Sequence, residues 1–288
     1  MTPLLHLSDT HFGTAQPRVV RALERLVQAQ KPGLAVLSGD ITQRATRTQF
    51  AEARDFIGGL GVPQWVLIPG NHDIPLFDLR ARLWTPYGRY REAFGHDLAP
   101  EADTADWRVL SNNTTRWYRH KHGEISRRQI VETGRQLQLA ADANPAQIRI
   151  VVVHQPVAVQ HVEDETDVLR GSGPALRQWA AAGADIVLAG HIHLPFAVPL
   201  HQRQPLARPL WAVQAGTAVS LRVRPGAPNS VNLLRASCRD GERQCRLERW
   251  DFIAAAGEFM LVREETLALA PTPVPAAHDT ARCLVHAG

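Results

Sequence analysis

Clusters of polar side chains follow short apolar runs along the first two thirds of the chain. The longest is Gly70-Asn71-His72-Asp73, which comes after the apolar run 65–68 and the turn-forming Pro69. Similar clusters follow other apolar runs, namely Asp9-x-His11, Gly39-Asp40, His154 and Gly190-His191-x-His193. Packing gives no reason for acids, imidazoles and an amide to recur at these places. These residues are therefore candidates for chemistry.

The side-chain types in these clusters fit metal ions. Carboxylate, imidazole and carboxamide donors without a thiolate suit two hard or borderline divalent ions, such as Mn, Fe, Zn or Ni. Two-metal hydrolases hold their ions roughly 3.5 to 4 Å apart, which requires a carboxylate that both ions share. Asp40 follows Gly39 and has no histidine beside it, so we expect Asp40 to take the bridging position.

His72 and Asp73 are the candidate catalytic residues. A histidine can carry or deliver a proton near neutral pH, and a carboxylate beside it can orient its ring. A single histidine in a loop is usually only a solvated side chain, so the prediction rests on the whole combination. The histidines outside these clusters, His120 among them, are expected to be structural or exposed.

The clusters need a scaffold that brings them together. Apolar runs alternate with segments of helical periodicity, and the expected strands are 3–7, 34–37, 65–68, 148–153 and 185–189, with helices at 19–30, 50–60, 126–141 and 174–183. This order predicts right-handed βαβ units and a mostly parallel sheet core. Because the carboxyl ends of parallel strands share one edge, the polar clusters are expected to converge in one crevice there.

The other segments are less regular. Residues 74–111 mix aromatic and arginine side chains, and they form either a cap-like excursion over the site or an amphipathic segment packed on the body. After residue 193 the pattern changes to Pro-rich turns and strands that are expected to be antiparallel, at 210–214, 230–235, 245–252 and 258–262. Residues 1–264 are thus expected to form a single domain, and 265–288 a disordered C-terminal tail.

Length and composition narrow the class of protein. The 288 residues suffice for one large α/β domain, and the formal net charge is +4. Lys31 and Lys121 are the only lysines and no dense basic run occurs, so nucleic-acid binding is only weakly supported.

The sequence also bears on location. No apolar run could span a bilayer, and no apolar signal segment precedes Ser8. The odd number of cysteines favours a reducing compartment. We expect a cytoplasmic protein with no membrane partner, and the oligomeric state stays open.

Taken in order, the motifs Asp9-x-His11, Gly39-Asp40, Gly70-Asn71-His72-Asp73, His154 and Gly190-His191-x-His193 resemble the calcineurin-like metallophosphoesterase family. The chain is most similar to the bacterial branch of class III cyclic-nucleotide phosphodiesterases and glycerophosphodiesterases, because of its His-x-Pro and Gly-His-Ile-His motifs. The resemblance implies an α/β fold, a four-layer αββα sandwich of two mixed β-sheets flanked by helices. The metal site would lie at the C-terminal strand ends.

The resemblance also implies a role for each site residue. One ion would be held by Asp9, His11, Asp40 and His193, and the other by Asp40, Asn71, His154 and His191. A hydroxide bridging the ions would attack phosphorus in line, while the ions neutralise charge on the phosphoryl oxygens. His72 would donate a hydrogen bond or proton to the leaving oxygen, and Asp73 would fix the tautomer of His72.

The function implied by the resemblance is a dinuclear metal-dependent phosphodiesterase that acts on a small phosphodiester, with a 3′,5′-cyclic nucleotide as the leading candidate. The alternatives are a nuclease, a phosphomonoesterase or a nucleotide-lipid pyrophosphatase of the same fold, and a non-enzymatic scaffold, which would be expected to have lost ligands.

Arg44 lies close enough to Asp40 in sequence to contact a phosphate or a base, although a surface ion pair explains it equally well. Many relatives carry a second histidine where this chain has Gln155; if that position touches substrate, the departure affects specificity but not metal binding.

Overall fold

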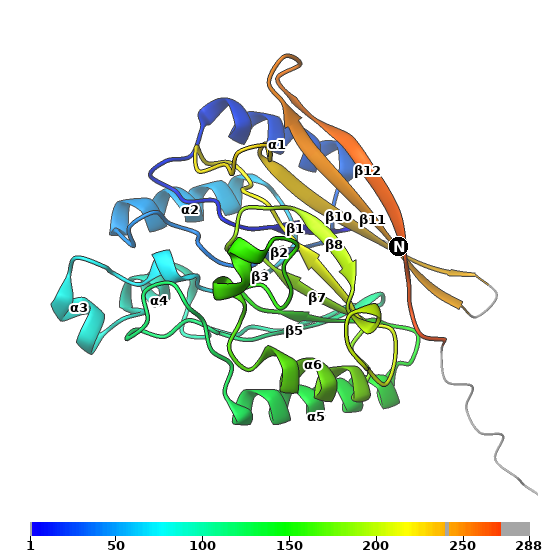
Figure 1. Cartoon of the computed structure of the whole chain (residues 1–288). Coiled ribbons are helices and arrows are strands. Elements are labelled where there is room, and N and C mark those ends of the chain that lie inside the picture. The colour runs from blue at the N-terminus through cyan, green and yellow to red at the C-terminus, as the bar shows by residue number, and fades with distance from the viewer. Residues whose placement is uncertain (1, 240–241, 272–288) are drawn as a thin grey trace, which may run out of the picture.

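Two six-stranded sheets pack face to face in the computed structural model, which describes residues 2–239 and 242–271 (Figure 1). The strands of the first sheet are β1 (Leu4–Leu7), β2 (Leu34–Leu37), β3 (Gln64–Leu67), β10 (Ser230–Arg239), β11 (Glu242–Ile253) and β12 (Glu258–Ala268). Those of the second are β4 (Ala102–Asp103), β5 (Trp107–Ser111), β6 (Ile148–Val152), β7 (Ile186–Ala189), β8 (Phe196–Pro199) and β9 (Trp211–Gln214). Their spatial orders are β12-β11-β10-β1-β2-β3 and β4-β5-β6-β7-β9-β8.

Each sheet has a parallel core with antiparallel additions. In the first sheet β1, β2 and β3 run parallel, and β10 to β12 continue as antiparallel neighbours. In the second, β5, β6, β7 and β9 run parallel, while β4 and β8 are antiparallel edge strands. The strand expected at 210–214 corresponds to β9, which is antiparallel to β8, as expected, but parallel to β7 on its other side. The chain turns back between β8 and β9, so β9 runs in the direction of β7.

Helices cover the outer face of each sheet (Figure 1). The four long helices are α1 (Pro17–Gln30), α2 (Arg47–Gly59), α5 (Arg127–Ala143) and α6 (Ser172–Ala181). α1 and α2 bury apolar side chains such as Leu23 and Phe50 against the first sheet, and α5 and α6 bury Leu137 and Trp179 against the second. α5 begins with a capping box, in which Ser126 and Gln129 satisfy each other's backbone groups.

A third apolar cluster lies between the two sheets. Leu4 and Val36 from the first sheet meet Trp107, Ile150 and Leu188 from the second, and all are fully buried or nearly so. The layers are therefore helix, sheet, sheet and helix, which confirms the predicted αββα sandwich. The carboxyl ends of the parallel strands in both sheets are left free to carry loops.

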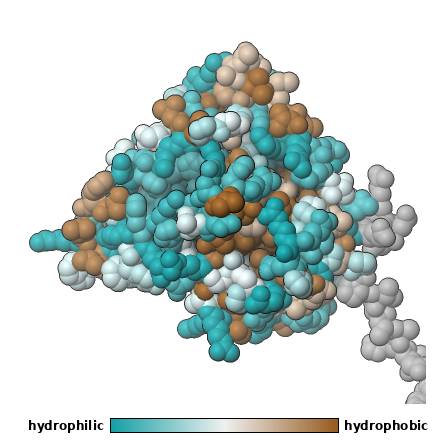
Figure 2. All heavy atoms as spheres, viewed as in Figure 1, coloured by the Kyte–Doolittle hydropathy of each residue, from teal (hydrophilic) through white to brown (hydrophobic). Residues whose placement is uncertain are grey.

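Only part of the segment 74–111 is an excursion. β5 is a full strand of the second sheet, and α4 (Gly88–Phe94) buries Tyr90 against Phe50 of α2. The short helix α3 (Leu79–Trp84) buries none of its residues, and it projects at the left of Figure 1. Figure 2 shows hydrophobic surface gathered at this edge, where Phe77, Leu79, Leu83 and Trp84 are exposed.

The C-terminal boundary of the domain differs from the expected one. β12 continues to Ala268, and Leu267 is completely buried between the sheets. The tail therefore does not begin at residue 265, because burying Leu267 keeps the strand going; the rest of the expected tail, 272–288, lies outside the described residues. Within the described part of the chain, no helix has the length and apolar character needed to cross a membrane.

Candidate metal centre

The structure brings the polar clusters of the sequence together at one edge of the sandwich. The residues come from the carboxyl ends of strands in both sheets: Asp9 and His11 follow β1, Asp40 follows β2, Asn71 follows β3, His154 follows β6, and His191 and His193 follow β7. The backbone amide of Asp9 donates to Gly39, and that of His191 donates to the Asp9 carboxylate at 2.9 Å. Neighbouring strand ends are thus tied to each other directly.

Five of these seven residues adopt an unusual backbone conformation. Positive φ angles occur at Asp9 (53°), His11 (42°), Asp40 (49°), His191 (77°) and His193 (57°). L-residues rarely adopt this left-handed region, and strained backbone is often found at functional sites. The sharp turns that it produces direct side chains from separate loops to a common point.

The candidate metal ligands form two groups, called the donor groups because each residue offers an atom that could bind a metal ion. The first donor group consists of Asp9, His11 and His193. The Nε2 atoms of the two histidines lie 3.2 Å apart, and Oδ1 of Asp9 lies 3.7 Å from the first and 3.3 Å from the second. Nδ1 of His193 donates to the backbone carbonyl of Arg222, so its Nε2 carries the lone pair. All three donor atoms therefore face one point.

The second group consists of Asp40, His154 and His191, with Asn71 beside them. Nδ1 of His154 donates to the Ser38 carbonyl at 2.8 Å. Its Nε2 faces Oδ1 of Asp40 at 3.4 Å and Oδ1 of Asn71 at 3.2 Å. Two acceptor oxygens and an imidazole lone pair aimed at each other indicate a site for a cation.

Asp40 lies between the two groups. Its Oδ1 belongs to the second group, while its Oδ2 lies 3.9 Å from Nε2 of His11 in the first. The backbone amide of His72 donates to Oδ1 at 2.8 Å and helps to hold the carboxylate. This is the position expected of the bridging ligand.

Several atoms of these groups lack a partner in the described chain. Oδ1 of Asp9, Nδ1 of His11 and both ring nitrogens of His191 are buried without a hydrogen bond. Neither Asp9 nor Asp40 pairs with a lysine or arginine among the residues that the structure describes. Buried carboxylates need a counter-charge, so the donor set fits two divalent ions.

The pKa values reflect this unbalanced charge. Burial would raise the pKa of Asp40, but the nearby His154 and His72 hold it well below the usual range. Burial lowers the pKa of His154, yet the charge of Asp40 and its hydrogen bond outweigh burial and raise that pKa to about 9. Burial dominates at His11 and lowers its pKa to about 3. When no metal ion is bound, protons on histidines such as His154 thus balance part of the charge of the carboxylates.

His72 lies beside the donor groups without joining them. Its Nδ1 lies 3.0 Å from the carbonyl oxygen of Gln43, which can only accept, so Nδ1 carries the ring proton. The ring packs edge-on against His11, with centroids 4.9 Å apart. The tautomer of His72 is therefore set by the Gln43 backbone.

The expected contact between Asp73 and His72 is absent. The Asp73 carboxylate accepts from the backbone amides of Gly70, Ile41 and Thr42 at 2.9, 3.0 and 2.8 Å, and from the Thr42 hydroxyl. The prediction that Asp73 orients His72 is wrong, because its oxygens are used to join the loops after β2 and β3. Burial and the charge of Asp40 raise the pKa of Asp73 to about 6, against the effect of those amides.

A pocket of about 250 Å³ opens over the donor groups. It is lined by Asp40, Asn71, His72, His191 and His193 and also by His120, Lys121 and Arg222. Sequence reasoning missed the last three, because they lie in loops with no motif around them. Nζ of Lys121 lies 2.8 Å from Oδ1 of Asp167, a carboxylate that also lies 3.7 Å from Nε2 of His191.

Arg44 and Gln155 do not line this pocket. The guanidinium of Arg44 lies 5.0 Å from the centre of the exposed Phe77 ring, outside the pocket wall. Gln155 is buried, accepts from Thr114 and donates to the carbonyl of Lys121. It therefore supports the loop that carries Lys121.

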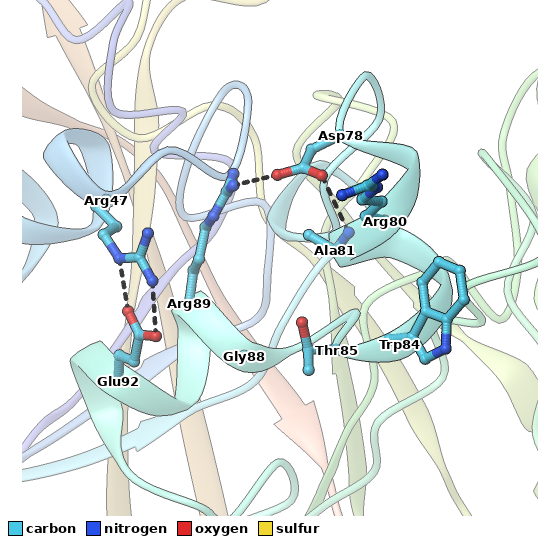
Figure 3. Close-up of a pocket in the computed structure, with 9 residues that line it drawn as sticks. All are labelled: Arg47, Asp78, Arg80, Ala81, Trp84, Thr85, Gly88, Arg89 and Glu92. Carbon is cyan, nitrogen blue, oxygen red and sulfur yellow. Dashed lines mark hydrogen bonds and ion pairs between the residues drawn. The ribbon is translucent and has the colours of Figure 1, made fainter.

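A second cleft, of about 550 Å³, lies at the base of α3 (Figure 3). In Figure 3 Arg89 reaches Asp78, and Arg47 makes a paired contact with Glu92 at 2.9 and 3.0 Å. These cations are already neutralised by acids of the same cleft. Arg89 thus links α4 to the start of α3, and Arg47 links α2 to α4, so the metal pocket is the better candidate for a phosphate site.

The parallel strand ends, the paired donor groups and the shared carboxylate define the class of two-metal hydrolases. Comparison of sequences gives the family: the profile of the calcineurin-like phosphoesterases matches residues 2–195. The chain belongs to this family and is a metal-dependent phosphoric ester hydrolase whose cofactors are two divalent metal ions. A search of curated protein sequences finds no match.

Solved structures share the fold at low sequence identity. A purple acid phosphatase from yellow lupin (Lupinus luteus) is 12% identical with a TM-score of 0.66, and the match covers 93% of this chain but 53% of the lupin chain. A dimetal phosphatase from Danio rerio is 13% identical with a TM-score of 0.62, covering 93% of this chain and 99% of that one. The chain therefore spans about half the length of the lupin enzyme, and these likenesses establish the fold.

Proposed function

We propose that the chain hydrolyses a small phosphodiester, with a 3′,5′-cyclic nucleotide as the leading candidate. The observation that carries the proposal is the meeting of two donor groups at Asp40 in a pocket of about 250 Å³. This volume lies just below the roughly 300 to 1,000 Å³ that is usual for small-molecule sites, which supports a small substrate. The preference for a cyclic diester rests on the resemblance of the sequence motifs to the phosphodiesterase branch.

In this proposal, one ion is held by Asp9, His11, Asp40 and His193, and the other by Asp40, Asn71, His154 and His191. Bound divalent ions would supply a nucleophile from water at neutral pH and would offset charge on the phosphoryl oxygens. The chain orients the two imidazole rings. Backbone carbonyls accept from Nδ1 of His154 and His193, which leaves Nε2 of each ring as the atom that would bind the metal.

His72 acts on the leaving oxygen in this scheme. It lines the pocket next to both donor groups, and the Gln43 carbonyl fixes its ring. A histidine placed there can give a hydrogen bond or a proton to the departing alkoxide of an alkyl diester. An alkoxide is a poor leaving group, so it gains most from this help. Arg222 on the pocket wall adds positive charge where an anionic diester would bind, whereas Lys121 is paired with Asp167.

The proposal is tested by an activity screen of the purified protein reconstituted separately with Mn, Fe, Zn or Ni. The substrates are cyclic nucleotides, glycerophosphodiesters, nucleotide-lipids, phosphomonoesters and single-stranded DNA, and Asp40→Ala controls for contaminating phosphatases. We expect the highest kcat/KM on a 3′,5′-cyclic nucleotide. A clear preference for another class would replace the substrate, and no hydrolysis by the two-metal protein would favour the scaffold alternative.

A further inference from the structure

Arg222 enters the pocket from a loop that none of the family motifs reaches. The loop joins β9 to β10 and is tied to the β1 loop, with the amide of Ala218 donating to Ser8 and that of Leu221 to Thr14. The carbonyl of Arg222 accepts from Nδ1 of His193 and from the Thr217 hydroxyl. The main chain of Arg222 is therefore fixed by a residue of the first donor group.

The side chain of Arg222 reaches across the pocket to His72. Its Nη1 lies 2.9 Å from Nε2 of His72 and 3.3 Å from Oε1 of Gln43. A guanidinium can only donate, so Nε2 of His72 is the acceptor in this contact. Because Nδ1 already donates to the Gln43 carbonyl, the two contacts agree on a neutral ring with its single proton on Nδ1.

In this arrangement the charge of Arg222 is unpaired within the described chain, and Nε2 of His72 is engaged by Arg222. Arg222 forms no ion pair among the residues that the structure describes, since its side-chain partners are the uncharged Gln43 and His72. At the same time, Nε2 of His72 cannot contact a leaving oxygen while Arg222 donates to it. A planar guanidinium beside a metal pocket is suited to bind two oxygens of a phosphoryl group.

We propose that Arg222 binds the non-bridging phosphoryl oxygens of the substrate, and that it leaves Nε2 of His72 when it does so. Nε2 of His72 is then free to face the leaving oxygen. Arg222 thus couples substrate binding to the release of His72. The inference deepens the proposed function and rests on it, because it needs a phosphoester at the metals.

Phosphate binding by the two-metal protein tests this proposal without requiring turnover. The probe is inorganic phosphate, titrated calorimetrically into Zn-loaded wild type, Arg222→Ala, Arg222→Lys and Leu221→Ala. Leu221 is 67% exposed on the same loop and makes a matched control. We expect about 10- to 100-fold weaker binding for Arg222→Ala, a smaller loss for Arg222→Lys and none for Leu221→Ala.

Nitrogen NMR of ¹⁵N-histidine-labelled Zn protein reports on His72 directly, with His72→Ala identifying its signals. Phosphate should shift Nε2 of His72 in the wild type toward its position in Arg222→Ala. Equal phosphate affinity in wild type and Arg222→Ala would overturn the binding role, and an Nε2 signal that phosphate leaves unchanged would overturn the release. If phosphate binds as expected but no phosphoester is hydrolysed, the proposed function fails while the Arg222 contact stands.

Discussion

Asp40 is the residue on which both donor groups depend. Its two oxygens face different histidines, His11 and His154, and no arginine or lysine of the described chain neutralises it. The other carboxylate of the site, Asp9, belongs to one group only. Removal of Asp40 therefore takes away a ligand from each proposed ion as well as the charge that holds them together.

We expect Asp40→Ala to lose both ions. Metal content after gel filtration, measured by mass spectrometry, should fall from two ions per chain in the wild type to well below one. Asp167→Ala is a suitable comparison, because Asp167 contacts only His191 of the donor groups and should leave the first ion bound. Retention of two ions per chain by Asp40→Ala would refute the bridging position.

His72→Ala separates metal binding from chemistry. Because His72 is not a donor in either group, the variant should keep both ions. Turnover of an alkyl diester should fall by about 10²- to 10³-fold, and that of a nitrophenyl diester far less, since a good leaving group needs little proton donation. Full activity of the variant on the alkyl diester would exclude the proposed role.

Protons should compete with the metals at His154 and His193. Nearby carboxylates raise the pKa of His154 to about 9 and also raise that of His193, although burial opposes both shifts. A raised pKa means that the imidazole keeps its proton to higher pH, so apparent metal affinity should increase as pH rises toward 9. His11 and His191 have lowered pKa values and should contribute no proton near neutrality.

Calorimetric titration of Zn into the metal-free protein, in buffers of different ionisation enthalpy, measures this competition. We expect about one to two protons released at pH 7 and almost none above pH 10. His154→Gln should release fewer protons at pH 7 than the wild type. A binding heat that does not depend on the buffer at pH 7 would contradict the prediction.

At the scale of elements, the strand ends of the site were the most predictable part of the fold. Each apolar run gives way to a turn-forming or polar residue and then to a polar cluster, so β1, β2, β3, β6 and β7 could be placed from sequence. The second sheet was harder, because β4, β5 and β8 lack a clear pattern and strand direction depends on the path of the loops. Arg222, Lys121 and His120 were missed for the same reason, since only tertiary structure brings their loops to the pocket.

Asp73 shows a further limit of sequence reasoning. An acid beside a catalytic histidine is often its partner, but here the Asp73 carboxylate is surrounded by three backbone amides. Nothing in the sequence indicates which neighbour will satisfy a buried carboxylate. The ligand set was easier to predict, because the order of the motifs and the parallel sheets together bring their residues to one edge.

The glycine at the tip of β3 should be essential for joining the loops. A Cβ on Gly70 would lie 2.1 Å from both the amide nitrogen and Oδ1 of Asp40, so Gly70→Ala must displace the bridging carboxylate. We expect this variant to lose both metals and to melt several degrees lower in the metal-free state. Differential scanning calorimetry and metal analysis check both effects.

Gly58→Ala in α2 is the matched control for Gly70→Ala. An added Cβ at Gly58 meets no atom within 4 Å, so this variant should keep its metals and melt at the wild-type temperature or slightly above. If Gly70→Ala behaves as Gly58→Ala does, the close packing of the two loops is not what positions Asp40.

At the scale of the whole molecule, a buried ion network joins the two sheets away from the metals. Asp185, just before β7, accepts from Arg243 of β11 at 2.7 and 3.0 Å and from Arg208 at 2.6 Å, and lies 3.6 Å from Arg149 of β6. Asp185, Arg149 and Arg243 are all at most 3% exposed. Burial lowers the pKa of Arg149 to about 10 despite Asp185, so this arginine is still charged at neutral pH.

Asp185→Asn should therefore destabilise the fold while leaving the site intact. The substitution keeps the shape of the side chain but leaves the arginines with buried charge that no carboxylate balances, which typically costs about 3 to 5 kcal/mol in the free energy of unfolding. Urea unfolding of the metal-free protein measures this loss, and kcat/KM of the metal-loaded protein under folding conditions should match the wild type.

Glu92→Gln is the control. It removes the exposed ion pair between Glu92 and Arg47 that Figure 3 shows, and it should hardly move the urea midpoint. An equally small change in Asp185→Asn would mean that β6, β7 and β11 are held together by apolar packing alone. It would also mean that water solvates the arginines once their carboxylate is lost.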